Sequence, residues 1–418
     1  MTEKELILLG VDWGSEQHQV CVLNGDGEIL REELVAHSGE ALNQLADELI
    51  ALVQGDASKI RVAIEVPRGP IVETLLERGM AVFAINPKQL DRFRDRHGVS
   101  GAKDDRRDAF VLADSLRTDL KKYRKVELGD PLVIQLRELT RMHEELKGER
   151  VMLGNRLLDQ LRRYFPQVLE LGSVYESRWV WELLEMAPSP ELGRRLAPAK
   201  ITRVLRRHRI RRITADEVSK NLQKQALCVA DGVVAASSQH VRMLIKRLRV
   251  VDEQQTEVVR QIEALLERLS EPAEGEEGHR DAYLLRTLPG LGRLGCATML
   301  AEAWTPLAHR DYQSLRGFFG SSPVTKKSGK QYQVIQRMAC NHRLRNTLHY
   351  WAKNAVQRET RAKNQYARLR AAGHSDGRAL RGVGDRLLAV AVAMLRSRKP
   401  YDPELRNRRA VESSRSAA

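Results

Sequence analysis

The stretch LILLGVDWGSEQHQVCVLNGDGEIL, residues 6–30, decides the fold of the first part of the chain. The segment from Leu6 to Asp12 is apolar up to its final aspartate and predicts a buried strand. HQVCVL predicts a second strand, and NGDG (residues 24–27) is a hairpin turn signal before EIL. We therefore expect a β-hairpin at the start of an α/β domain, with Asp12 closing the first strand.

Helices and strands then alternate. Residues 39–53 predict a helix, and IRVAIEV (60–66) predicts an apolar strand that ends near Glu65. IVETLLERG (71–79) predicts a short helix, and AVFAIN (81–86) a further strand. We assign residues 1–128 to one α/β domain.

The segment 129–280 is predicted to be almost entirely helical and contains two long heptad-like runs. Apolar residues recur in three- and four-residue steps, which is the pattern of a coiled coil. The runs comprise Leu132, Leu136, Leu139, His143, Leu146, Arg150, Leu153 and Leu157, and then Val241, Leu244, Leu248, Val251, Gln255, Val258, Ile262, Leu265 and Leu269. The two helices could pair within one chain or across subunits, and His143, Arg150 and Gln255 would help to fix their register.

A Pro/Gly/Glu linker (271–281) precedes a second helical domain, which we assign to residues 281–398. Residues 399–418 are predicted to be a polar, disordered tail.

The charge balance points to a polyanionic partner. There are 70 basic and 55 acidic residues, a net charge of +15, and nucleic acid is the usual partner of such a chain. A basic surface without a partner is the alternative. Residues 200–214 contain no acid and interleave apolar side chains, which favours a nucleic-acid contact. The cations that we assign to it are Arg206, Arg207, Arg209, Arg211 and Arg212.

Cysteine usage and hydropathy argue against several other classes. The four cysteines lie far apart without zinc-ligand spacing, which is typical of a reduced, cytoplasmic protein. The apolar run near the N-terminus ends at an aspartate, so we expect neither a signal peptide nor a membrane span.

Four carboxylates could meet at one edge of the predicted sheet. Asp12 and Glu65 end strands, while Asp105 and Asp108 lie three apart in AKDDRRDAF (102–110) and would share a helix face. Such crowding requires cations, and Mg²⁺ suits carboxylate oxygens. The alternative is a set of ordinary strand ends with Asp104 or Asp105 as a helix cap, and spacing alone does not separate these two acids. An actin-like or sugar-kinase-like ATPase also begins with a strand, Asp-x-Gly and a hairpin, but the late glycines (290–295) stand in a helical context without the strands that this fold needs.

The C-terminal region carries motifs suited to phosphate. TLPGLGRLG (287–295) predicts a helix-hairpin-helix-like turn in which Gly290 and Gly292 let the backbone approach a phosphate. A plain turn between packed helices is the alternative. PVTKKSGKQYQV (323–334) places Ser328 among cations, and a strongly basic helix covers 341–370. Candidate phosphate ligands here are Lys326, Lys327, Lys330, Arg337, Arg343 and Arg345, although each also fits a solvated surface.

Together these motifs resemble the DEDD transposases of the insertion-sequence 110 family. The resemblance rests on GVDWGSEQHQVCVL, the strand AIEVPRGP and a K-x-D-x-x-D-A motif, followed by LPGLG, FFGSSPVTKKSGK and N-x-x-L-R. The matching positions are Asp12, Glu65, Lys103, Asp105, Asp108, Ala109, Asn341, Leu344 and Arg345.

The resemblance implies an RNase H/RuvC-like domain with Mg²⁺ on Asp12, Glu65, Asp105 and Asp108. It selects Asp105 over Asp104 and implies Ser328 as a nucleophile that forms a covalent phosphoserine link to DNA. Ser321 and Ser322 stay alternatives for this role. We add Lys103 and Arg106 as nucleic-acid contacts.

The family further implies donor and target double-stranded DNA, a structured guide RNA, and a dimer or tetramer with composite sites, associated with the nucleoid. Two other functions stay open: a Holliday-junction-type nuclease that activates water without a serine, and a binding scaffold with an inactive site.

Overall fold

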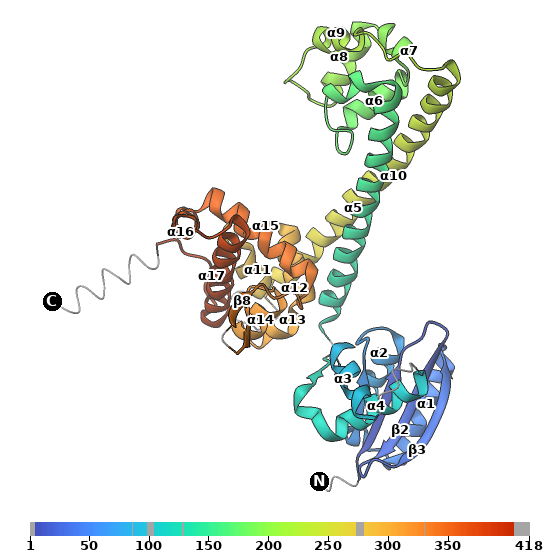
Figure 1. Cartoon of the computed structure of the whole chain (residues 1–418), viewed down its shortest axis with the longest axis vertical. Helices are drawn as coiled ribbons and strands as arrows, with labels where there is room; N and C mark the ends of the chain where they lie inside the picture. Colours follow the sequence, from blue (N-terminus) through green and yellow to red (C-terminus); the bar gives the residue numbers. More distant parts are fainter. Residues whose placement is uncertain are drawn as a thin grey trace, which may run out of the picture. The chain divides into compact units, whose positions relative to one another are not determined.

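The chain divides into two units, Met1–Gly129 and Asp130–Ala418 (Figure 1). The structure, a computed structural model, describes residues 5–85, 87–97, 104–127, 129–272, 280–329 and 331–404. Lys103, Lys330, most of the predicted linker and the predicted tail beyond residue 404 lie outside the described residues.

A mixed sheet forms the centre of the first unit, in the order β3-β2-β1-β4-β5-β6. β1 pairs antiparallel with β2 and parallel with β4; β2–β3 and β5–β6 are antiparallel, and β4–β5 is parallel. The predicted hairpin and the strands that follow it are therefore confirmed. The strands are β1 (Ile7–Asp12), β2 (Gln17–Asn24), β3 (Ile29–Ala36), β4 (Ile60–Ile64), β5 (Ala81–Ala84) and β6 (Arg124–Lys125).

Helices cover both faces of this sheet. Since side chains of successive strand residues point to opposite faces, alternate residues of one strand belong to different buried clusters. Leu9 and Val11 of β1 pack with one buried cluster, while Leu8 packs with another. The first cluster includes α1 (Gly39–Leu52) and α2 (Pro70–Glu77); the second includes α3 (Pro87–His97) and α4 (Asp105–Asp119). This burial on both faces explains why LILLGV is continuously apolar.

Two long helices organise the second unit, α5 (Pro131–Tyr164) and α10 (Asp231–Ser270). They run side by side within one chain (Figure 1), and their contacts pair the end of one helix with the start of the other. Arg150 Nη1 donates to Gln255 Oε1 at 2.6 Å, and Gln255 Nε2 lies 3.3 Å from His143 Nε2. The three polar residues expected to fix the register therefore contact one another.

Each end of this helix pair carries its own apolar cluster. One cluster joins α5 and α10 to the short helices α6 (Arg178–Met186), α7 (Pro190–Arg194), α8 (Pro198–Arg207) and α9 (Ala215–Leu222). The other joins them to the C-terminal helices. These are α11 (Asp281–Arg286), α12 (Arg293–Glu302), α13 (Trp304–Ala308), α14 (Tyr312–Phe318), α15 (His342–Arg358), α16 (Thr360–Ala371) and α17 (Asp376–Ser397).

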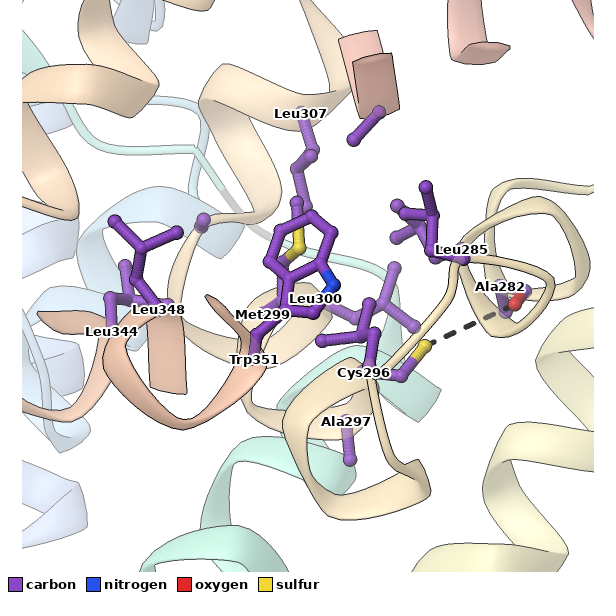
Figure 2. Close-up of a cluster of buried hydrophobic side chains, with 14 of the residues drawn as sticks. Ala282, Leu285, Cys296, Ala297, Met299, Leu300, Leu307, Leu344, Leu348 and Trp351 are labelled. Carbon is purple, nitrogen blue, oxygen red and sulfur yellow. Dashed lines mark hydrogen bonds between the residues drawn. The ribbon is translucent and has the colours of Figure 1, made fainter. Parts of the chain in front are cut away.

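Within the C-terminal helices, α15 packs its apolar side chains against α12. Figure 2 shows Leu344, Leu348 and Trp351 beside Met299 and Leu300. One element stands apart from this core: the hairpin of β7 (Val324–Ser328) and β8 (Gln331–Ile335). It separates α14 from α15 in sequence and is solvent-exposed along almost its whole length.

Candidate active site

Asp12 and Glu65 lie at the same edge of the sheet. Val11 is the register partner of Ile64 in the parallel β1–β4 pair, so the next residue of each strand is one of the two acids. Both carboxylates are half-buried. Because parallel strands end at one edge, this pairing follows directly from the sequence positions.

The other two acids lie at the start of α4. Asp104 is the N-cap, and its carboxylate accepts a hydrogen bond from the Arg106 backbone N–H at 3.2 Å. Asp105 is exposed in the first turn, whereas Asp108 is only 1% exposed. The spacing in the sequence did not separate Asp104 from Asp105, but the structure shows a difference between them. Asp104 caps the helix, whereas Asp105 shares a helix face with Asp108.

Gly10 lets α4 approach β1 closely enough to bring these acids near Asp12. A Cβ on Gly10 would lie 1.9 Å from the Ala109 carbonyl oxygen and 2.6 Å from the Ala113 nitrogen. Any other residue would push the helix away from the strand. The glycine two residues before Asp12 therefore sets the distance between the strand acids and the helix acids.

A cation of the chain itself occupies this edge. Arg94 of α3 donates from Nε to Asp108 Oδ1 at 2.5 Å and from Nη2 to Oδ2 at 2.6 Å. Its Nη1 donates to Asp91 at 2.6 Å. The pKa of Arg94 is raised, mainly by the hydrogen bonds to Asp108; the charges of Asp91 and Glu65 contribute less. Sequence reasoning missed Arg94, because nothing in DRFRDRH marks one arginine above its neighbours.

The four acids share an edge but do not close around one point. Among the residues that the structure describes, no three acid, histidine or thiol groups are placed to hold a metal ion. The donor set itself fits a hard divalent cation, since all four groups offer carboxylate oxygens. The bidentate pairing of buried Asp108 with Arg94 indicates that this edge requires positive charge.

The turn after Asp12 is held by the buried His18, which contacts the exposed His37. The Gly14 N–H donates to His18 Nδ1 at 3.4 Å, and His18 Nε2 lies 2.9 Å from His37 Nδ1. Nδ1 of His18 is therefore the acceptor, so Nε2 carries the proton and the ring is neutral. Burial, and secondarily His37, lowers the pKa of His18.

Ser328 ends β7, pairs with Gln331 across the hairpin and is exposed. Lys326 lies two residues earlier and so shares a face with Ser328, whereas Lys327 points to the opposite face. That opposite face also carries Tyr332, the register partner of Lys327, which is 66% exposed. The hairpin thus presents Ser328 and Lys326 on one face and Tyr332 on the other.

The two alternative serines have structural contacts. Ser321 Oγ donates to Asp385 Oδ1 at 2.7 Å, and Asp385 also accepts from Arg316 Nε at 2.8 Å. The Ser322 carbonyl accepts from Arg337 Nε at 3.3 Å. Ser328 is therefore the most accessible of the three serines. Arg337 fastens the chain after the hairpin to the chain before it.

The basic segment, which comprises most of α8 and the residues after it, has a buried side and a solvent-exposed side. The interleaved apolar residues Ile201, Val204 and Leu205 are buried. The five predicted arginines are exposed; they are Arg206, Arg207, Arg209, Arg211 and Arg212. Arg207 pairs with Glu182 at 2.6 Å, and Arg212 reaches the Leu171 carbonyl at 3.5 Å. In the first unit, the exposed Arg106 pairs with Glu32 at 2.5 Å.

The predicted glycine turn is packed against α15. Gly290 has φ +77°, and a Cβ there would lie 2.5 Å from the Ala355 nitrogen. Trp351 Nε1 donates to the Pro289 carbonyl at 3.0 Å, which fastens the turn further. Gly292 caps α12 with open space around it. The geometry gives Gly290 a packing role and leaves only Gly292 accessible for a ligand.

Residues of the N-x-x-L-R helix divide between structure and surface. Asn341 caps α15 and donates to Glu302 Oε2 at 2.9 Å, while Arg343 pairs with Glu302 at 2.8 Å and Glu144 at 2.7 Å. Burial alone would raise the pKa of Glu302, but the charge of Arg141 and the bond from Asn341 lower it overall. Arg343 therefore has internal partners, and Arg345 is left facing a pocket.

Comparisons with known proteins agree with these motifs. Residues 9–166 match the DEDD, IS110-type family "Transposase", and residues 282–367 match the "Transposase IS116/IS110/IS902 family". "Putative transposase y4uE" of Sinorhizobium fredii is 47% identical over 229 residues, 54% of this chain and 63% of that protein. "Mini-circle putative transposase for IS117" of Streptomyces coelicolor is 29% identical over 407 residues, 95% of this chain and 96% of that protein.

The class that these matches define is DNA transposase. The chain belongs to the IS110 family of transposases. Membership implies dependence on a divalent metal ion and binding to DNA. Across the described ranges, no helix is long and apolar enough to cross a membrane.

Proposed function

We propose that this chain cuts and rejoins DNA strands for an insertion element, with Asp12, Glu65, Asp105 and Asp108 as its acidic cluster and Ser328 as its nucleophile. The observation that supports the proposal is that Asp12 and Glu65 follow paired positions of the parallel strands β1 and β4, while α4, whose first turn carries Asp105 and Asp108, packs closely on β1. The sheet order, with β1 between β2 and β4, supports an RNase H/RuvC-like domain.

The acids would hold divalent cations, Mg²⁺ by the hardness of their oxygen donors. The bound ions would supply charge stabilisation at the scissile phosphate and would lower the pKa of a coordinated hydroxyl. Arg94 pairs with Asp108 and orients its carboxylate. Gly10 holds the helix acids close to the strand acids.

Ser328 would attack phosphorus through Oγ, forming a P–O bond while the bond from phosphorus to the leaving sugar oxygen breaks. The resulting phosphoserine preserves a phosphodiester for rejoining. Because Lys326 shares the face of Ser328, it is the better placed of the two described lysines to hold the phosphate. The serine must lose its proton, and no histidine lies beside it in sequence, so metal activation is the simplest route.

Further parts of the proposal concern partners. The exposed arginines at the end of α8 and between α8 and α9, together with the capping Gly292, are candidate contacts to double-stranded DNA or to a structured guide RNA. We also propose composite sites in a dimer or tetramer and a nucleoid-associated, cytoplasmic location. The α5–α10 pair, most of whose heptad positions are buried within the chain, would act as an antiparallel coiled-coil spacer between its two ends.

The strongest competing function is a nuclease that uses the acids to activate water. Cleavage of element-end DNA by the full chain, with RNA from the element and Mg²⁺, separates the two. We expect Ser328→Ala to abolish cleavage and Ser321→Ala to retain it after a modest loss of stability, since Ser321 bonds Asp385. Full cleavage by Ser328→Ala would favour the nuclease.

A further inference from the structure

A pocket lies between α15, α17 and the residue that follows β8. Its polar lining consists of Arg345, Asn346 and His349 of α15, Arg381 of α17 and Gln336 beyond the hairpin. Its apolar lining includes Phe319 and Leu380, which are almost fully buried. The lining contains no acidic residue.

The two arginines of this pocket lack a counterion. Both are half-buried, and within the part of the chain that the structure describes no carboxylate pairs with either. Arg381 Nη1 donates to Gln336 Oε1 at 3.0 Å, which orients the guanidinium without neutralising it. Burial, with a smaller effect of Arg378, lowers the pKa of Arg381. Partly buried cations without a partner are unfavourable, so the pocket is suited to an anion.

The start of α17 adds to the same preference. This 22-residue helix has no side-chain cap, and Gly377 of its first turn lines the pocket. A Cβ on Gly377 would lie 3.7 Å from Arg381 Nη1, so the guanidinium folds back over the first turn. Unpaired N–H groups at a helix start favour negative charge. The acid of this turn, Asp376, accepts a hydrogen bond from Tyr366 at 2.7 Å and does not line the pocket.

We propose that this pocket binds a backbone phosphate of the DNA strand that Ser328 attacks. The proposal rests on the proposed function and adds a defined anchor point to it. Arginine is suited to the task because its planar fork binds phosphate oxygens in pairs. Gln336, Asn346 and His349 supply further groups able to donate hydrogen bonds.

The hairpin sets the spacing between anchor and nucleophile. Gln336 follows Ile335, the register partner of Val324, and it lies five residues along the strand from Gln331, the register partner of Ser328. At about 3.4 Å per residue the two points are about 17 Å apart along the hairpin. At about 3.4 Å of rise per nucleotide, the anchored phosphate lies about five nucleotides from the scissile one.

The test is phosphate-neutralisation scanning with the full chain. Element-end duplexes carry one uncharged methylphosphonate at successive positions around the cleavage site, and binding is measured by fluorescence anisotropy. For the wild type we expect binding to weaken about tenfold when the neutral linkage is at one position, about four to six nucleotides from the cleavage site. Arg381→Gln should remove that sensitivity and reduce the salt slope of binding by about 1.

Arg378→Gln is the matched control, because Arg378 is exposed on the same helix and outside the pocket lining. Binding by Arg378→Gln should still weaken when the methylphosphonate is at the position that is sensitive in the wild type. The proposal is overturned if no position in that window is sensitive, or if both variants lose it equally. Arg345→Gln repeats the test should Arg381→Gln not fold.

Two further experiments test whether the bound strand is DNA or RNA, and whether the anchor or the proposed chemistry is wrong. If Arg381→Gln weakens binding only to RNA oligonucleotides of the same sequence, the assignment of the pocket to DNA is overturned. Ser328→Ala should bind DNA with the wild-type phosphate pattern while losing the covalent product. Normal covalent product from Arg381→Gln with an unchanged phosphate pattern would refute the anchor and leave the proposed chemistry standing.

Discussion

Removing the guanidinium of Arg94 should destabilise the N-terminal unit strongly unless another cation replaces it. In Arg94→Gln the Asp108 carboxylate, 1% exposed, would lose both of its charge-assisted hydrogen bonds. Breaking a buried ion pair from one side costs about 3–5 kcal/mol. Because the Arg94 side chain is 23% exposed, we expect the lower end, about 3 kcal/mol.

The control and the rescue make this prediction specific. Arg96→Gln on the same helix removes a pair with Asp119 in which the arginine is 55% exposed, and should cost less than about 1 kcal/mol. Asp108→Asn in the Arg94→Gln background removes the unpaired charge and should recover most of the loss. Millimolar Mg²⁺ should also stabilise Arg94→Gln more than the wild type.

Denaturant unfolding of the full chain, with hydrogen exchange of the α3 and α4 amides as the local probe, measures these effects. The expected result is faster exchange in both helices for Arg94→Gln only. If Arg94→Gln and Arg96→Gln lose similar stability, and Asp108→Asn restores nothing, the Arg94–Asp108 pair does not hold this edge together.

Three other predictions follow from the same unit. Gly10→Ala should cost about 1–3 kcal/mol and abolish DNA cleavage by displacing α4, whereas Gly39→Ala, with open space around it, should change neither; equal effects in thermal unfolding would contradict this. Asp105→Asn should abolish cleavage and Asp104→Asn should not, because asparagine preserves the cap; the reverse order in a cleavage assay would exchange their roles. Because the pKa of His18 is lowered on folding, its contribution to stability is complete above about pH 6.5 and is lost as the pH falls through the lowered value; His18→Gln should weaken this acid sensitivity in unfolding experiments, and an unchanged pH profile would count against it.

Much of the fold could be predicted because local patterns decided it. The apolar run before Asp12 and the NGDG turn specify the hairpin, and the heptad positions of α5 and α10 specify a buried seam. The pairing of those helices within one chain could not be predicted, since the same seam could bury itself against a second copy.

The candidate site was predictable in composition but not in its contacts. Strand ends and motif spacing indicated Asp12, Glu65 and Asp108, because chain position alone brings strand ends to one edge. The contacts of Arg94 depend on the packing of α3 against α4, and the position of Arg381 in the pocket depends on the packing of α17 beside α15. Such long-range side-chain pairings leave no periodic trace in the sequence.

Two motif residues also changed meaning once their surroundings were known. Arg343 looked like one more cation on a basic helix, but its pairs with Glu302 and Glu144 are internal. Gly290 looked like a phosphate-binding glycine, but α15 fills the space beside it. In both cases the residue type was correctly noticed, and only tertiary contacts could assign its role.

We propose that Ser328 forms a covalent bond to DNA with the help of the N-terminal acids. Mass spectrometry of the adduct tests this directly, with the adduct trapped on element-end DNA that carries a nick to prevent rejoining. We expect a nucleotide attached to the peptide containing Ser328 in the wild type, and no adduct in Ser328→Ala or Asp12→Asn. An adduct on another residue, or cleavage without any adduct, would contradict it.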